Sequence, residues 1–341
     1  MTKVLNIMFA KGLGGVEQVF LDYDHALKSE NKQSVSVIHP NSSVKNKLSG
    51  NYFELGTFSR FDWFAAIKLR QFIKDNKIDL LFTHGNRAAN ITQKACLGKV
   101  PIISVVHNYK FKPLLKSNYL IAITDDLKRK LIEAKFPSNK IFKLNNPIIL
   151  EEKTDIKFKE LAYCPTIGFM GRFVYKKGIH VLIDAIKKLR EKNINIKVTF
   201  AGDGEEKDKI TQQIRSLGLE KTIKLIGWVE DKKAFFKNID ILVIPSLHEP
   251  FGLIVLEGLA HLKPIIATKS EGPSEILHNG IDGILVEINS SDEIVDAIED
   301  LINNPEKAKK IAMNGHKEVK KYDIVKFAKN LQKIIKEVVV S

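Results

Sequence analysis

Two glutamates, Glu249 and Glu257, stand in the apolar stretch SLHEPFGLIVLEGLA. The proline and glycine after the first of them predict a turn, so Glu249 lies in a loop and a helix begins near Leu253 with Glu257 inside it. An ionised carboxylate in such a helix needs a partner, either the hydroxyl groups of a bound ribose or an interior lysine. The backbone of Phe251, Gly252 and Leu253 at the helix N-terminus could receive a phosphate.

A cationic loop, GRFVYKKG, stands near the start of the second half of the sequence. It follows a run typical of a strand and precedes a helical pattern, which places Arg172 and Lys177 at the carboxyl end of a strand beside Gly171. Arginine binds phosphate as a fork and lysine binds it as a point charge, so the pair predicts a clamp for a diphosphate. The alternative is a pair of ordinary surface cations, since lysine is common in this chain.

A glycine-rich loop, KGLGGVE, follows the first predicted strand. It lacks the spacing of a dinucleotide-binding loop, because Glu17 stands where the third glycine is required and no acid follows the second strand. Gly14 and Gly15 still let the backbone pass close to a ligand, and the next helix presents free N–H groups to an anion. A tight strand-to-helix turn without a ligand is the alternative.

The sequence predicts no metal site. Asp22 and Asp24 form a D-x-D pattern, but two residues on a helix are about 200° apart, so their carboxylates diverge. The two cysteines stand far apart, and neither has the ligand spacing of a zinc site. His107, at the end of a predicted strand, is by itself more typical of a hydrogen-bonded structural histidine.

Short runs rich in β-branched residues alternate with helical patterns, which favours an α/β fold with parallel sheets. Each half of the chain is predicted to form its own doubly wound unit, with ligands at the carboxyl ends of its strands. The charged segment 150–161 is predicted to link the halves, and 322–340 to be an amphipathic helix. The predicted strands are 4–9, 34–38, 79–83, 101–106, 119–123, 140–144, 165–170, 196–201, 222–226, 240–244, 264–267 and 283–286.

The basic excess lies almost wholly in the first half. Residues 1–150 hold 23 Lys and Arg against 11 Asp and Glu, a net charge of +12, and residues 151–341 hold 31 against 29, a net charge of +2. This asymmetry predicts an anionic partner for the N-terminal half. No apolar run approaches the roughly 20 residues of a membrane span, and too few apolar residues precede the glycine loop for a signal peptide, so we expect a cytoplasmic protein.

Residues 61–76 are predicted to form a helix with a basic outer face. Arg60, Arg70 and Lys74 gather on that face, with Trp63 and Ile67 among them. An aromatic side chain within a basic face is typical of a helix lying on anionic lipid, and an ordinary solvated face is the alternative. The stripe expected to point inward consists of Phe61, Phe64, Ala65, Leu69, Phe72 and Ile73.

In combination, these motifs resemble those of the retaining GT-B glycosyltransferases of family 4, the glycogen-synthase-like group. The resemblance covers nearly the whole chain and rests on EPFGLIVLEGLA, GRFVYKKG, the N-terminal glycine pair, AGDGEE at 201–206 and GPSE at 272–275. It implies a GT-B fold, in which two Rossmann-like domains with parallel sheets face each other across a cleft. Residues 1–150 would form the acceptor-side domain and 151–321 the nucleotide-sugar domain, with the helix 322–340 packing back on the first.

The resemblance also implies a role for each candidate residue. Arg172 and Lys177 would neutralise the diphosphate of the donor, Glu257 would hold the ribose, and Glu249 with the Phe251–Leu253 backbone would hold the transferred sugar. No metal or cofactor would be required, because the cations stabilise the departing diphosphate. The further implied contacts are Gly14 and Gly15 with the donor phosphate, His107 with the sugar, and Glu275 near the diphosphate.

The expected function is transfer of a hexose or N-acetylhexosamine from a UDP-sugar to a membrane-associated glycan or lipid, as in lipopolysaccharide or surface polysaccharide assembly. We expect the protein to be peripheral on the inner face of the cell membrane. Two alternatives remain open: a nucleotide-sugar epimerase of the same fold, and a non-catalytic basic module that binds membrane or nucleic acid. No nucleic-acid partner is expected, since no recognised motif is present and the basic runs are short.

Overall fold

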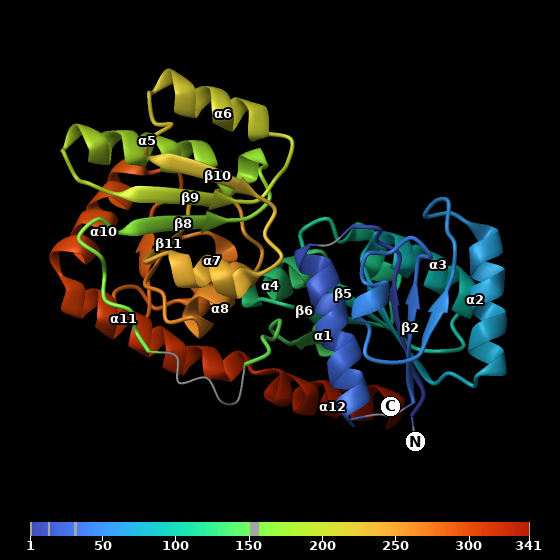
Figure 1. The fold of residues 1–341 in the computed structure, drawn as a ribbon. Helices are drawn as coiled ribbons and strands as arrows, with labels where there is room; N and C mark the ends of the chain where they lie inside the picture. Colours follow the sequence, from blue (N-terminus) through green and yellow to red (C-terminus); the bar gives the residue numbers. More distant parts are fainter. Residues whose placement is uncertain (1, 13, 31–32, 151–156, 341) are drawn as a thin grey trace. The chain divides into compact units, whose positions relative to one another are not determined.

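The structure, a computed structural model, describes residues 2–12, 14–30, 33–150 and 157–340 (Figure 1). The chain divides into two compact units: unit 1 is Met1–Ile149 with Tyr322–Ser341, and unit 2 is Leu150–Lys321. The linker predicted over 150–161 lies partly outside the described residues, and its described part, 157–161, has no helix or strand. None of the helices in the described ranges is long and apolar enough to cross a membrane.

Unit 1 is built on a seven-stranded sheet with the order β3-β2-β1-β4-β5-β6-β7. All neighbouring strands are parallel. The central strands are buried along their whole length, which fits their continuous apolar sequences and a sheet covered on both faces. The strands are β1 (Val4–Met8), β2 (Ser34–Ile38), β3 (Tyr52–Glu54), β4 (Leu80–His84), β5 (Ile102–Val106), β6 (Tyr119–Ala122) and β7 (Ile141–Lys143).

The last helix of the chain belongs to unit 1, where it lies beside the first helix (Figure 1). The ring of Phe327 packs edge to face on Tyr23, with 5.0 Å between the centroids, and Ile148 forms a parallel bridge with Asp323. The apolar face predicted for the segment 322–340 is buried here. The helices of unit 1 are α1 (Gly15–Glu30), α2 (Trp63–Asp75), α3 (Asn86–Cys96), α4 (Asp125–Glu133) and α12 (Ile324–Val340).

Unit 2 is built on a six-stranded sheet with the order β10-β9-β8-β11-β12-β13, again with all neighbours parallel. Its strands are β8 (Thr166–Met170), β9 (Lys197–Ala201), β10 (Ile223–Gly227), β11 (Ile241–Ile244), β12 (Ile265–Thr268) and β13 (Ile284–Val286). Its helices are α5 (Ile179–Glu191), α6 (Lys207–Ser216), α7 (Lys232–Asn238), α8 (Leu253–Ala260), α9 (Glu271–Ile276), α10 (Ser291–Asn303) and α11 (Pro305–Glu318).

The predicted α/β class with two doubly wound parallel sheets is confirmed. Each predicted strand is present to within one or two residues at either end, whereas β3 was not predicted. In both sheets the chain first adds strands on one side of the first strand and then adds the later strands on its other side. This change of side, the reversal point of the sheet, falls between β1 and β4 in unit 1 and between β8 and β11 in unit 2. In open parallel sheets, ligands bind outside the carboxyl ends of the strands at this point, so the loops that follow these four strands are where a site is expected.

A candidate active site

Two loops meet at the reversal point of the unit 2 sheet, one after β8 and one after β11. The N–H of Leu247 donates to the carbonyl of Lys176 over 2.8 Å, which ties the loops together through their backbones. Gly178 has a φ of +64°, and a Cβ there would lie 1.9 Å from the carbonyl oxygen of Pro245. Glycine at this position therefore permits the close approach that joins the cationic loop to the end of β11.

This approach brings together two of the predicted residues, Lys177 and Glu249. The Nζ of Lys177 donates to Oε2 of Glu249 in an ion pair, and the hydroxyl of Ser246 lies 3.4 Å from the same oxygen. The side chains are 19% and 11% exposed, so both charges are largely removed from water. A cation and a carboxylate are thus held side by side where this fold binds ligands.

A third loop, at the start of α9, supports Glu249. The backbone N–H of Glu249 donates to Oε2 of Glu271 over 3.2 Å, and its carbonyl accepts from the N–H of Gly272 over 2.8 Å. The other carboxylate oxygen of Glu271 lies 2.6 Å from Nδ1 of His248. Sequence reasoning missed Glu271 and His248, because only the order of the strands shows that these loops are neighbours.

Gly272 allows this support, since a Cβ there would lie 2.0 Å from the carbonyl oxygen of Phe251. A Gly272→Ala variant is expected to destabilise unit 2 by about 2 kcal/mol, because the backbone oxygen must move away from the new methyl group. Denaturant unfolding followed by Trp228 fluorescence, in a Trp63→Phe background, would measure this loss. Gly280→Ala is the control, since that glycine has a φ of +74° but open space around it, and conformational strain alone costs about 1 kcal/mol. Equal losses in the two variants would contradict the prediction.

The predicted N-terminus of the helix after Glu249 is present. Gly252 precedes α8 with a φ of +87°, Phe251 is buried, and Leu253 is the first helical residue. In the described part of the chain, no side chain caps this end of the helix. Its first N–H groups and its positive dipole end are therefore suited to an anion.

Glu257 has a lysine partner. Its Oε1 accepts from Nζ of Lys232 over 2.6 Å, and the carboxylate is 16% exposed while the lysine is 45% exposed. Of the two partners expected for this carboxylate, the structure shows a lysine. This lysine lies near the surface and not in the interior.

The remaining predicted residues of unit 2 lie on the same loops. Arg172 is exposed, and a Cβ on Gly171 would lie 3.9 Å from Cε of Lys177, so the stem of that lysine passes over the glycine. Glu275 is half-buried in α9. Arg172 is thus on the predicted loop, and its side chain faces solvent.

In unit 1, Gly14 and Gly15 form the turn that opens α1. The carbonyl of Gly14 accepts from the N–H of Gln18 over 2.9 Å, and Gly15 is exposed as the first residue of the helix. The turn that opens α1 is therefore present, with Gly14 half-buried and Gly15 exposed.

His107 is buried and pairs with a second histidine that was not predicted. Its Nε2 lies 3.0 Å from Nδ1 of His84 at the end of the neighbouring strand β4. Burial lowers the pKa of His107 to about 4, and burial together with the charge of His107 holds the pKa of His84 well below its usual range. Both rings are therefore neutral at pH 7, and His107 could meet a ligand only as a neutral imidazole.

The outer face of α2 differs from the prediction in one respect. Trp63 and Ile67 are more than half exposed, as expected, but Phe61 and Phe64 are 58% and 82% exposed and not inward. Asp62 caps the helix by accepting from the N–H of Ala65 over 3.0 Å, so Phe61 precedes the helix, whereas Phe64 is a helical residue on its outer face. The residues of α2 that are buried are Ala65, Ala66, Leu69 and Ile73.

The cations around this face have different environments. Arg70 donates to the carbonyls of Lys94 and Ala95 at the end of α3, over 2.8 and 3.0 Å. These hydrogen bonds connect α2 to the end of α3. Lys94 lies over the ring of Trp63 at 4.6 Å, and the guanidinium of Arg60 lies 4.8 Å from the ring centre of Phe61. Lys74 is exposed in the last turn of α2. Exposed aromatic rings and cations are therefore interleaved, as the sequence indicated.

Residues 152–318 match the family described as glycosyl transferases group 1. The lipopolysaccharide core biosynthesis glycosyltransferase LpsE of Rhizobium meliloti is 25% identical over 344 residues, covering 92% of this chain and 93% of that protein. The capsular polysaccharide biosynthesis glycosyltransferase CapM of Staphylococcus aureus is 32% identical over 213 residues, covering 59% and 56%.

Solved structures show the same fold. HepE of Anabaena in complex with UDP-glucose has a TM-score of 0.85 at 20% identity, covering 99% of this chain and 100% of that one. A glycosyltransferase from Rickettsia africae has a TM-score of 0.85 at 21% identity, covering 100% and 99%. The match of residues 152–318, the similarity to LpsE over most of both chains and the shared fold together identify the chain as a glycosyltransferase with the GT-B fold.

Proposed function

We propose that this glycosyltransferase moves a hexose or N-acetylhexosamine from a UDP-sugar to a membrane-associated glycan or lipid, with retention of the anomeric configuration and without a metal ion. The observation that carries the proposal is the ion pair of Lys177 and Glu249 at the reversal point of the unit 2 sheet. Two findings support the choice of substrates: HepE was solved with UDP-glucose, and LpsE is named for lipopolysaccharide core biosynthesis.

In this proposal, unit 2 binds the donor and stabilises the departing UDP. Lys177 and Arg172 neutralise the diphosphate, and the N-terminus of α8 adds its dipole. Glu249, fixed by Ser246 and by the loop before α9, holds the transferred sugar. Glu257 holds the ribose through the carboxylate oxygen opposite the one that contacts Lys232.

In this proposal, unit 1 binds the acceptor. Gly14 and Gly15 are assigned to the donor phosphate and His107 to the transferred sugar, with His107 donating or accepting a hydrogen bond as a neutral ring. Acceptor attack then occurs on the face from which UDP departs, which retains the anomeric configuration. The family 4 resemblance supports this assignment.

A thermal-shift panel of nucleoside diphosphates and their sugars tests the donor. A bound nucleotide at about 100 times its Kd should stabilise the protein by about 2.7 kcal/mol, and we expect UDP and one UDP-sugar to give the largest shift. Unchanged melting points at millimolar concentration for the whole panel would exclude a donor site. Conversion of the donor into its epimer with no acceptor added would identify an epimerase instead.

The proposed membrane contact involves the aromatic patch, defined here as Phe61, Trp63, Phe64 and Ile67. Truncating Phe64, whose side chain is 82% exposed, should not affect folding. A Trp63→Ser/Phe64→Ser variant is expected to bind vesicles of phosphatidylglycerol and phosphatidylethanolamine at least about ten-fold more weakly, because two aromatic rings no longer enter the interface.

Cosedimentation with vesicles measures this change. Tyr163→Ser is the matched control, because it removes an aromatic ring that is 97% exposed in unit 2. If the patch variant and the control sediment with vesicles as well as the parent does, the patch is an ordinary solvated surface.

A further inference from the structure

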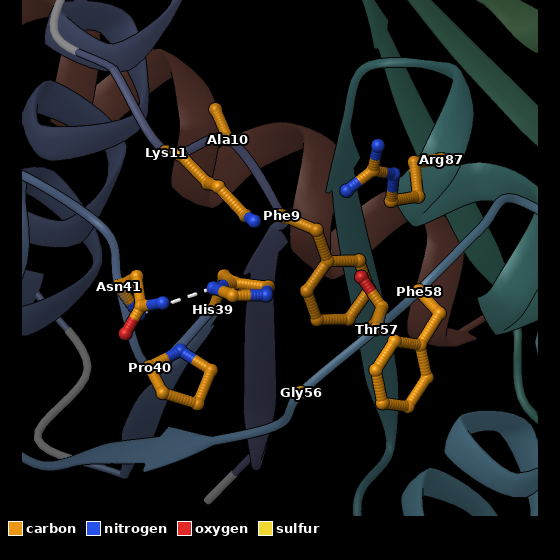
Figure 2. A pocket seen from close by; sticks show the side chains of 10 residues that line it. All are labelled: Phe9, Ala10, Lys11, His39, Pro40, Asn41, Gly56, Thr57, Phe58 and Arg87. Atoms are coloured by element: carbon orange, nitrogen blue, oxygen red, sulfur yellow. Dashed lines mark hydrogen bonds between the residues drawn. The ribbon is translucent and has the colours of Figure 1, made fainter.

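A cavity lies in unit 1, and none of the residues assigned above lines it. Figure 2 shows its lining residues, most of which follow the carboxyl ends of β1, β2 and β3. The volume of the cavity is about 680 Å³. This is large enough for a sugar with a substituent. The residues that line it are Phe9, Ala10 and Lys11 after β1, His39, Pro40 and Asn41 after β2, Gly56, Thr57 and Phe58 after β3, and Arg87 in α3.

Three nitrogen-bearing side chains converge on this cavity, those of Lys11, His39 and Arg87 (Figure 2). Many lysines of the chain form ion pairs with carboxylates, for example Lys28 with Asp24 on α1. Within the described ranges, no carboxylate pairs with any of the three cavity residues. The cavity therefore concentrates positive charge that the protein itself leaves unneutralised.

His39 can donate a hydrogen bond into the cavity. It is 7% exposed, and its Nδ1 accepts the backbone N–H of Asn41 over 3.1 Å, so the proton of the neutral ring is on Nε2. Burial lowers the pKa of His39, and the charges of Lys11 and Arg87 lower it further. Both effects favour the neutral ring, which can donate from Nε2.

Two more features point to a polar ligand. The hydroxyl of Thr57 is buried and, among the residues described, has no hydrogen-bond partner. Arg87 is the second residue of α3, a helix whose N-cap is Gly85 and therefore has no capping side chain. The positive end of the helix dipole adds to the charge of the arginine.

The rim of the cavity carries an apolar ring. The side chain of Phe58 is 99% exposed there, whereas Phe9 is buried beneath. A flat exposed ring next to charged donors suits a ligand with an apolar ring face and an anionic substituent, which is the chemistry of a sugar phosphate or a sugar acid.

We propose that this cavity binds the anionic group, a phosphate or a carboxylate, of a sugar in the acceptor, through Lys11, His39 and Arg87. That the ligand is the acceptor rests on the proposed function, whereas the binding of an anionic sugar rests on the cavity alone. The proposed function assigns the donor diphosphate to Lys177 and Arg172 of unit 2, so we expect a different anion in this cavity.

Calorimetric titration of the full-length protein at low salt tests the proposal, with glucose 6-phosphate, glucuronate and neutral glucose as probes. We expect one anionic sugar to bind at least about ten-fold more tightly than glucose, and Arg87→Gln and Lys11→Gln each to weaken it by about ten-fold. The better of the two anionic probes identifies phosphate or carboxylate. Lys329→Gln, which removes one exposed charge from α12, is the control and should bind as the parent does.

The proposal would be overturned by equal binding of glucose and both anionic sugars, or by unchanged binding in Arg87→Gln. Displacement of the bound sugar by UDP would also overturn it, because the cavity would then take the donor. Failure of the donor proposal can be distinguished from failure of the cavity proposal. Protein that binds glucose 6-phosphate but no UDP would refute the donor site and keep the cavity, and Lys177→Gln should leave the anionic sugar bound.

Discussion

A Lys177→Gln variant is expected to release UDP from its donor sugar at least about 100-fold more slowly than the parent. The lysine is the largely buried cation of the candidate site, and removing one preorganised group that stabilises developing charge typically costs two to three orders of magnitude in turnover. The same change leaves Glu249 without its ion-pair partner, so the position of that carboxylate is also lost. Turnover would be measured as UDP release from the UDP-sugar that gives the largest thermal shift.

Lys176→Gln is the matched control, because it removes the same charge from the adjacent residue. The side chain of Lys176 is exposed, and the loop uses only its backbone carbonyl, which accepts from the N–H of Leu247. This variant should keep nearly full turnover.

Glu249→Gln, alone and combined with Lys177→Gln, completes a double-mutant cycle. If the two residues act as a unit, the double variant should lose little more activity than either single variant. Equal turnover in the Lys177→Gln and Lys176→Gln proteins would remove the lysine from the mechanism.

Much of the fold could be predicted, because buried parallel strands carry continuous runs of apolar and β-branched residues. Ile102–Val106 is such a run, and it forms β5 as predicted. β3 was not predicted because Tyr52–Glu54 has only three residues, at the edge of the sheet, with no alternation to distinguish it from a loop. On α2, the periodicity was interpreted without the Asp62 cap, which sets where the helix begins and leaves Phe61 outside it.

The candidate site was predicted only as far as single motifs allow. Lys177 and Glu249 each stand in a motif at a strand end, so both could be selected before their contact was known. The partners His84, Glu271 and Lys232 could not be selected, because each belongs to a different strand or helix from its partner and has no motif of its own. The unit 1 cavity was missed for the same reason, since four separate segments contribute its lining.

The His84–His107 pair leads to the second large expected effect, a loss of stability in acid. The folded state keeps His107 unprotonated down to its pKa of about 4, whereas the unfolded chain protonates near 6.5. Between these values the unfolded state binds more protons, so the free energy of unfolding falls as the pH falls. The loss from His107 is about 3 kcal/mol between pH 6.5 and 4, and His84, whose pKa is also lowered, acts in the same direction.

Hydrogen exchange of the amides in β4 and β5, corrected for the intrinsic effect of pH on exchange, would follow this loss within unit 1. His107→Gln should remove about one proton from the pH dependence, which reduces the slope by about 1.4 kcal/mol per pH unit. His25→Gln is the control, because it removes an exposed histidine from the same unit. A parent protein whose β4 and β5 are equally protected at pH 6.5 and pH 4.5 would show that the pair is not buried in its neutral form, and His107 could then act as a charged group.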